Sequence, residues 1–186
     1  TIGSTIGSKM KQKAIMALLI ATVMIIVYIA FAFRQVPKSI GAWRFGLTAI
    51  VALIHDLIIT LGIFVVLGQV LNVEIDALFI TALLTIMGFS VHDTIVVFDR
   101  LRENLRHQSS DETFETVAER AVNETVVRSF NTSFSTFITV TVLFFLGAVS
   151  IKYFLLALMI GFVLGTYSSI FIATPLLVSW NNRQKM

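Results

Sequence analysis

Residues 14–33 read AIMALLIATVMIIVYIAFAF, a run of twenty residues without one charged side chain. Because an α-helix rises about 1.5 Å per residue, about 20 apolar residues are needed to cross the hydrocarbon core of a bilayer. The run is too long for the apolar core of a cleavable signal peptide, which has about 7–15 residues. The sequence therefore predicts a membrane-spanning helix at this place.

Four further runs of membrane-spanning length follow the first one. They cover residues 45–71, 77–98, 129–149 and 153–178. Hydrophobic residues make up 56% of the chain and charged residues only 13%, whereas a soluble domain has about 25% charged residues. This composition excludes an ordinary soluble domain, and the absence of cysteine excludes disulfides and thiolate metal sites. We expect an all-α membrane protein, a bundle of five transmembrane helices with its two ends on opposite faces of the membrane.

The distribution of positive charge predicts the orientation of these helices, because cytoplasmic loops are enriched in Lys and Arg. A cytoplasmic C-terminus places ten basic residues on the inner face and four on the outer face. The inner set is Arg34, Lys38, Arg44, Arg100, Arg102, Arg106, Arg120, Arg128, Arg183 and Lys185, and the outer set is Lys9, Lys11, Lys13 and Lys152. Trp43 and Trp180 fall at predicted inner ends, in the headgroup layer that such rings favour. Residues 1–13 then form an outer segment, the end of a missing periplasmic region, and residues 179–186 form a cytoplasmic tail.

Only one connection is long, and its sequence predicts structure of its own. Residues 99–128 contain seven acidic residues and five arginines. Ser109 and Glu112 have the spacing of a capping box, whose side chains satisfy the first free amides of a helix. Apolar residues then recur at helical spacing over residues 114–122. We expect a short amphipathic helix on the cytoplasmic face, which either caps the bundle or docks a partner.

Two His-Asp dipeptides, His55–Asp56 and His92–Asp93, lie inside predicted spans. An ionised side chain in hydrocarbon is costly, so such residues mark functional sites. Asp56 lies about 16 Å from the start of its run, near mid-membrane, and Asp93 about 8 Å from the inner end of its run. Burial favours the neutral carboxyl group and a nearby cation favours the charged one, so these aspartates are candidates for a proton site. The alternatives are a helix-end charge at Asp93 that reaches water and, for His55 and His92, a hydrogen-bonded contact between helices.

Arg128, at the start of the fourth span, is the cation that could pair with Asp93. Arginine is not deprotonated in proteins, so it would serve as a fixed counter-charge and not as a proton carrier. It can also pair with Glu124, one helical turn earlier. The alternative role is plain anchoring of the helix at the inner face.

The last two spans carry features of helix packing. Residues 129–149 contain many hydroxyl side chains, which either line a water-filled path or bond to neighbouring helices. Gly161 and Gly165 form a GxxxG motif, which permits close approach of two helices.

Other chemistries find little support in the sequence. Adjacent residues of a helix point about 100° apart, so neither His-Asp dipeptide easily presents both side chains to one metal ion. The chain has no glycine-rich phosphate loop, no HExxH motif and no nucleophile elbow. We therefore expect no enzyme, no cofactor, no metal and no nucleic-acid partner.

Residues 88–104 read GFSVHDTIVVFDRLREN and resemble the signature of SecF proteins, which is typically G-[YF]-S-V-N-D-T-I-V-V-F-D-R-[IL]-R-E-N. Further similarity lies in residues 53–56, 123–133 and 161–171. The resemblance covers essentially the whole chain and corresponds to transmembrane helices two to six of SecF, after its periplasmic domain.

The resemblance implies a mechanism that composition does not show. SecF pairs with SecD in a pseudo-twofold assembly similar to the resistance-nodulation-division transporters. The pair uses the proton motive force to help preproteins cross the inner membrane of bacteria through SecYEG. The implied partners are SecD, SecYEG, the accessory proteins YajC and YidC, the preprotein and membrane lipid. The counterparts of Asp93 and Arg128 belong to the proton pathway of that family, and we add His92, Asp56 and His55 from their positions.

Two departures from the family pattern matter. His92 replaces the usual asparagine, which places a titratable group beside Asp93. The first helix and the periplasmic domain are absent, so we expect this chain alone to lack the element that contacts emerging preprotein. Two other functions stay open, a proton-coupled exporter of small molecules from the same superfamily and a passive membrane scaffold.

Overall fold

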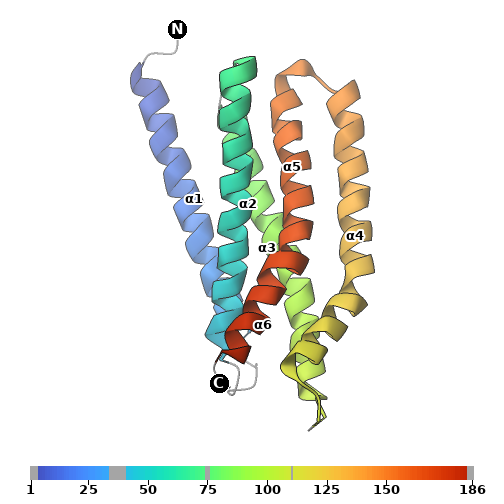
Figure 1. Cartoon of the computed structure of the whole chain (residues 1–186). Coiled ribbons are helices and arrows are strands. Elements are labelled where there is room, and N and C mark those ends of the chain that lie inside the picture. Colours follow the sequence, from blue (N-terminus) through green and yellow to red (C-terminus); the bar gives the residue numbers. More distant parts are fainter. Residues whose placement is uncertain (1–3, 34–40, 74–75, 110, 184–186) are drawn as a thin grey trace.

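The structure of the chain is a computed structural model that describes residues 4–33, 41–73, 76–109 and 111–183. Within these ranges the regular structure is entirely helical. Five helical segments are long and apolar enough to cross a membrane. They lie side by side, with the start of the first helix at one end of the bundle and the end of the last helix at the other (Figure 1). The predicted all-α fold with five spans is therefore confirmed.

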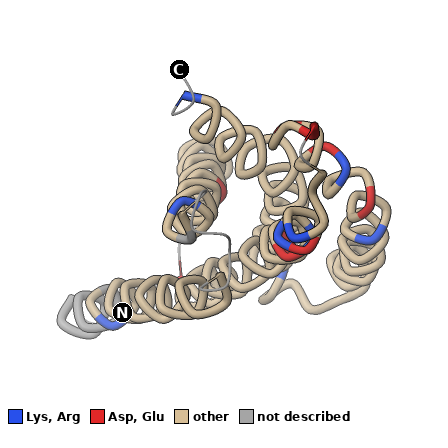
Figure 2. Tube along the Cα trace, turned by 90° about the horizontal axis from the view of Figure 1, so that it is seen from below, with Lys and Arg blue, Asp and Glu red and all other residues tan. Residues whose placement is uncertain are grey.

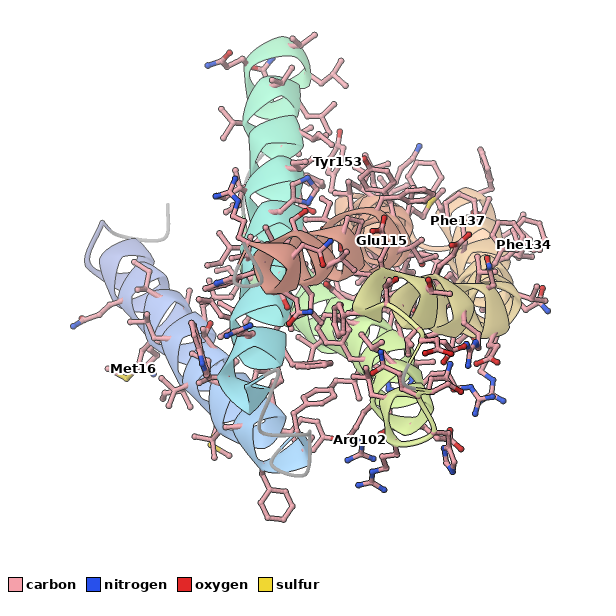
Figure 3. The ribbon with its side chains drawn as sticks, turned by 60° about the horizontal axis from the view of Figure 1, so that its bottom comes forward. Met16, Arg102, Glu115, Phe134, Phe137 and Tyr153 are labelled. Atoms are coloured by element: carbon pink, nitrogen blue, oxygen red, sulfur yellow. The ribbon has the colours of Figure 1, made fainter. Side chains whose placement is uncertain are left out.

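The first three crossings are single helices. They are α1 (Ser4–Ala32), α2 (Ala42–Leu71) and α3 (Ala77–Arg106). Helix α3 begins where the Asp76 side chain accepts a hydrogen bond of 2.9 Å from the backbone N–H of Phe79, since an aspartate at this position satisfies a free amide of the first turn. Helix α1 packs on the bundle over a small part of its surface, and Met16 points away from the other helices (Figure 3).

The connection between the third and fourth crossings differs from the sequence expectation. Helix α3 continues to Arg106, and α4 runs without a break from Phe114 to Leu146. The expected amphipathic helix and the fourth span are thus one helix, whose first turns are inclined to the rest (Figure 1). Neither glycine nor proline interrupts residues 99–106 or 114–146, and buried Leu101 continues the apolar stripe of α3, so the helices extend beyond the apolar runs.

The start of α4 also differs from the expectation. Thr113 caps this helix, because its side chain accepts a hydrogen bond of 3.2 Å from the backbone N–H of Thr116. Ser109 and Glu112 form a turn before the helix, where the N–H of Ser109 donates to the Glu112 carboxylate at 3.3 Å. The helix therefore begins about one turn after the predicted capping box. Phe114, which is buried, is the first apolar residue that the helix packs against the bundle.

The last crossing is interrupted where the sequence predicts one uninterrupted span. After a short turn η1 (Val149–Ile151), it consists of α5 (Lys152–Ser168), a π-helical turn η2 (Ser169–Ala173) and α6 (Thr174–Asn182). Pro175 lies in the first turn of α6 and has no N–H to donate to the preceding turn. The Thr174 hydroxyl donates a 3.0 Å hydrogen bond to the carbonyl of Ser169. This side-chain hydrogen bond adds to the backbone bonds of the irregular turn.

The buried apolar residues form two clusters, one near each end of the bundle. In the first, the Phe45 ring lies 5.4 Å from that of Phe33 and 5.3 Å from that of Phe98. In the second, the rings of Phe64 and Phe79 are 4.4 Å apart. On α2, α3 and the last crossing, a set of buried polar residues lies between these clusters. This polar layer, which includes Asp56, Ser90, Asp93, Ser168 and Ser169, contains the candidate site.

Candidate functional site

Asp56 lies in the middle of α2 and is completely buried, with 0% of its surface exposed. Its Oδ2 accepts a hydrogen bond of 2.6 Å from Ser90 Oγ of α3 and another of 2.7 Å from Ser168 Oγ of α5. Its Oδ1 lies 3.0 Å from Nδ1 of His55, the preceding residue. One carboxyl group thus connects three helices.

Asp93 lies on α3 and is 5% exposed. Its Oδ2 accepts a 2.7 Å hydrogen bond from Ser169 Oγ, the first residue of the π-helical turn. Ser129 of α4 lies close enough to interact with the same carboxyl group, although its hydroxyl is buried without a hydrogen-bond partner among the described residues. The side chain faces the interior of the bundle, as expected for an ionisable group that lipid cannot solvate.

The hydroxyls of Ser168 and Ser169 connect the last crossing to both carboxyl groups. Because they are adjacent and point in different directions, Ser168 contacts Asp56 and Ser169 contacts Asp93. Each hydroxyl also has a second acceptor on its own helix. Ser168 Oγ lies 3.3 Å from the carbonyl of Gly165, and Ser169 Oγ lies 3.0 Å from the carbonyl of Thr166. A hydroxyl has one proton to donate, and the backbone acceptor is nearer for Ser169 than for Ser168, so Ser169 is the serine that more readily exchanges its carboxylate for a backbone acceptor.

Two glycines allow α5 to approach α3 closely enough for these contacts. A Cβ added at Gly161 would lie 2.2 Å from Cγ1 of Ile86. A Cβ added at Gly165 would lie 3.1 Å from Cα of Ser90, the residue that bonds to Asp56. The GxxxG motif therefore lies at the contact between the two helices, next to the site.

The two histidines occupy different environments. His55 bonds to Asp56, its own neighbour in sequence, and 29% of its side chain is exposed. His92 is exposed on α3 and directly precedes Asp93 in the chain. In the described part of the chain, neither forms the hydrogen bond between helices that was the alternative role for them.

Arg128 lies outside this cluster. It is exposed and lines a polar cavity of about 710 Å³ at the end of the bundle where α3 ends and α4 begins, and the charged residues of that end gather there (Figure 2). Among the described residues it forms no ion pair with Asp93. Adjacent residues of a helix point about 100° apart, and here Ser129 instead of Arg128 approaches Asp93. The expected ion pair between Asp93 and Arg128 is therefore not formed in this structure.

The expected pair between Glu124 and Arg128 is replaced by contacts between two helices. Glu124 Oε2 accepts hydrogen bonds of 2.6 Å from Arg100 Nε and 2.9 Å from Asn104 Nδ2, both on α3. Nearby, Arg102 pairs with Asp99 and donates a 3.2 Å hydrogen bond to the carbonyl of Ala32 (Figure 3). These contacts hold the ends of α1, α3 and α4 together around the polar cavity.

The hydroxyl side chains of the fourth crossing divide between two roles. Ser133 Oγ accepts a hydrogen bond of 2.5 Å from Thr166 Oγ1 of α5, so it connects two helices. Other hydroxyls, such as those of Ser135 and Thr139, donate to carbonyls of α4 itself. In the described ranges, His, Asp and Glu side chains do not gather in a group of three or more that could hold a metal ion.

Sequence reasoning alone did not assign a role to Ser90, Ser129, Ser168 or Ser169. Ser90 lies three residues before Asp93 on α3, but its bond to Asp56 depends on how α2 and α3 cross. The available signal for Ser168 and Ser169 was a pair of hydroxyls in an apolar run shortly before Pro175. Pro175 removes one backbone hydrogen bond and so allows an irregular turn in this segment. π-helical turns inside helices occur frequently at functional sites.

These features define a class, a multi-pass α-helical membrane protein with two carboxyl groups buried in a polar layer between its helices. Residues 1–183 match the family described as "Protein export membrane protein SecD/SecF, C-terminal". The chain belongs to this family, as its resemblance to SecF predicted.

Individual relatives agree with the family. The chain is 50% identical over 183 residues to the protein translocase subunit SecF of Thermobaculum terrenum, which covers 98% of this chain and 56% of that protein. It is 39% identical to the protein translocase subunit SecDF of Thermus thermophilus, over 100% of this chain and 23% of that protein. A crystal structure of SecDF from the same organism superposes with a TM-score of 0.87 at 37% identity, covering 98% of this chain and 24% of that one. The chain thus spans a little over half the length of the SecF relative. It spans 23% of the SecDF relative, which is a longer protein.

Proposed function

We propose that this chain is the membrane domain of a SecF-like subunit, which works with SecD and uses the proton motive force to assist preprotein translocation across the bacterial inner membrane. The observation that supports this most is the pair of buried carboxyl groups on neighbouring helices, each bonded to one of two adjacent serines in an irregular turn. A buried carboxyl group whose serine partner has a second acceptor on its own helix can connect protonation to helix movement. The proposal assigns no enzymatic reaction to the chain.

In this proposal Asp93 is the group that takes up and releases the proton. As a carboxylate it holds the Ser169 hydroxyl at 2.7 Å, and α3 is thereby attached to η2. When Asp93 is protonated, Ser169 can donate to the carbonyl of Thr166 instead, and that attachment weakens. His92 adds a charge beside this group, and Asp56 and His55 form the second half of the polar layer. Arg128, in the polar cavity, would approach Asp93 in another state of the cycle.

The proposed partner is a SecD-like subunit at equal stoichiometry. The five helices leave polar positions such as Thr85 and His92 of α3 exposed at membrane depth, where lipid solvates them poorly. On another side, an apolar cavity of about 470 Å³ lies between α4 and the last crossing, next to Phe134 and Phe137 (Figure 3). Both features suit a bundle that is completed by further membrane helices, and the SecDF relatives, of which this chain covers about a quarter, support SecD as that partner.

The function is tested by depletion of the full-length protein in its host. We expect the maturation of a pulse-labelled secreted preprotein to slow several-fold in depleted cells. Dissipation of the proton motive force should then slow export less than in cells that carry the protein, because one consumer of that force is gone. Unchanged export together with loss of extrusion of a small toxic molecule would contradict the proposal and favour an exporter.

The proposed orientation is tested by single cysteines, since the chain has none of its own. Ser109→Cys lies in the connection between α3 and α4, and Ser150→Cys lies in the turn between α4 and α5, at the other end of the bundle. Both serines are exposed. In intact spheroplasts, a membrane-impermeant maleimide should label Ser150→Cys and leave Ser109→Cys unlabelled until the membrane is opened. The reverse pattern would mean that the C-terminus is outside.

A further inference from the structure

The two buried carboxyl groups have unequal hydrogen-bond environments, and this difference separates their roles. Asp56 Oδ2 receives two serine hydroxyls at 2.6 and 2.7 Å, and Oδ1 faces the His55 ring at 3.0 Å. Asp93 receives one hydroxyl at 2.7 Å. Two hydroxyl donors from α3 and α5 converge on Oδ2 of Asp56, so this carboxyl group is held from both neighbouring helices. The lengths at Asp56 fall in the range of charge-assisted O–H···O⁻ bonds.

We propose that Asp56 is a positioning residue that fixes the π-helical turn through Ser168, so that Ser169 is presented to Asp93. The inference rests on the proposed function and assigns different roles to the two carboxyl groups. Asp93 exchanges the proton. Asp56 holds the π-helical turn in place, so that the proton exchange at Asp93 moves the helices relative to a fixed turn.

The connection between the two groups is short and covalent. Ser168 and Ser169 are neighbours in the chain, so a fixed Ser168 restricts where Ser169 can lie. The carbonyl of Ser169 is also held by the Thr174 hydroxyl at 3.0 Å. Ser169 is thus restrained through Ser168 on one side and through Thr174 on the other. Its hydroxyl can still donate either to Asp93 or to the carbonyl of Thr166. In this arrangement Ser168 fixes the turn, and the acceptor that Ser169 uses depends on whether Asp93 is protonated.

The charged surroundings agree with this division. The titratable groups that adjoin the two carboxyl groups are His55 on α2 and His92 on α3. The last crossing has no charged residue from Tyr153 to Val178, and α4 presents the neutral Ser129 to Asp93. The last crossing therefore supplies hydroxyl groups and no cation to the two carboxyl groups.

The test is infrared difference spectroscopy of the full-length protein in liposomes, recorded as the pH is changed. Beside the bands of the exposed acidic residues, we expect one titrating C=O band from a buried carboxylic acid, which is lost in Asp93→Asn and kept in Asp56→Asn. Ser168→Ala should move the midpoint of the Asp93 band by about one pH unit, since it frees the turn that presents Ser169. The double variant Asp56→Asn/Ser168→Ala should shift the band no further than Asp56→Asn alone, because both changes break the same connection.

Ser133→Ala is the matched control, because Ser133 is a buried serine that bonds to α5 but contacts neither carboxyl group. It should leave the Asp93 band unchanged. A band that disappears in Asp56→Asn would show that Asp56 itself exchanges protons and would overturn the inference. An Asp93 band that Ser168→Ala does not move would also overturn it, and this variant serves if Asp56→Asn does not fold. Failure of the proposed function is distinct, since no titrating band would then depend on Asp93.

Discussion

Asp93→Asn is expected to abolish the export that depends on the proton motive force while the protein stays folded and assembled. The amide has the shape of the protonated acid, and its oxygen can still accept a hydrogen bond from Ser169, so packing of the buried site is kept. It has no proton to exchange, so the cycle stops in one state. The measurement is the maturation of a pulse-labelled preprotein in cells that carry only the full-length variant.

Asp76→Asn is the matched control on the same helix. Asp76 caps the start of α3, and asparagine caps a helix as well as aspartate does, so export should be normal. In the same assay Arg128→Lys should keep partial activity, because the charge remains and the planar fork is lost. Wild-type export from Asp93→Asn at normal abundance would mean that the proton pathway lies elsewhere.

Gly161→Ala is expected to separate α3 from α5 and to destabilise the protein by about 1–3 kcal/mol, the usual cost of overpacking a core. The new Cβ would lie within 2.8 Å of three side-chain atoms of Ile86, which is completely buried. Thermal unfolding in detergent should therefore begin at a lower temperature. Export should fall too, since Ser168 and Ser169 reach the carboxyl groups only while α5 lies close to α3.

Two variants separate overpacking from a general intolerance of substitution. Gly88→Ala adds a methyl group on α3 where no atom lies within 4 Å, so it should not lower stability. Ile86→Ala removes the atoms that the new Cβ would meet, so the double variant Gly161→Ala/Ile86→Ala should recover part of the lost stability. If Gly88→Ala were as harmful as Gly161→Ala, the helix contact would not be the cause.

The positions of the five crossings could be predicted because the length and polarity of an apolar run are local properties. The continuation of α3 over residues 99–106 was not predicted, nor was the joining of the expected amphipathic helix to the fourth span, since charged residues end an apolar run without ending a helix. The two aspartates stood out because a charge inside a span is rare. Their serine partners did not stand out. Ser168 lies 112 residues from Asp56, and which hydroxyl meets which carboxyl group depends on helix crossing.

The role given to Arg128 shows the same limit. Its place at the start of the fourth span suggested proximity to Asp93, but one residue along a helix changes the direction of a side chain by about 100°. Ser129 points to Asp93 as a result, whereas Arg128 lines the polar cavity. Sequence spacing located the correct turn of the helix and not the residue that faces the site.

The π-helical turn also limits how this segment can change in evolution. A π turn holds about one residue more than an α turn, so the loss or gain of one residue between Ser169 and Ala173 would rotate one side of the turn against the other by about 100°. If the serine pair kept its place, Trp180 would turn away from Trp43, whose ring centroid lies 5.0 Å away. If the tryptophan pair kept its place, the serines would leave the aspartates. Homologues should therefore accept substitutions in this segment far more readily than insertions or deletions.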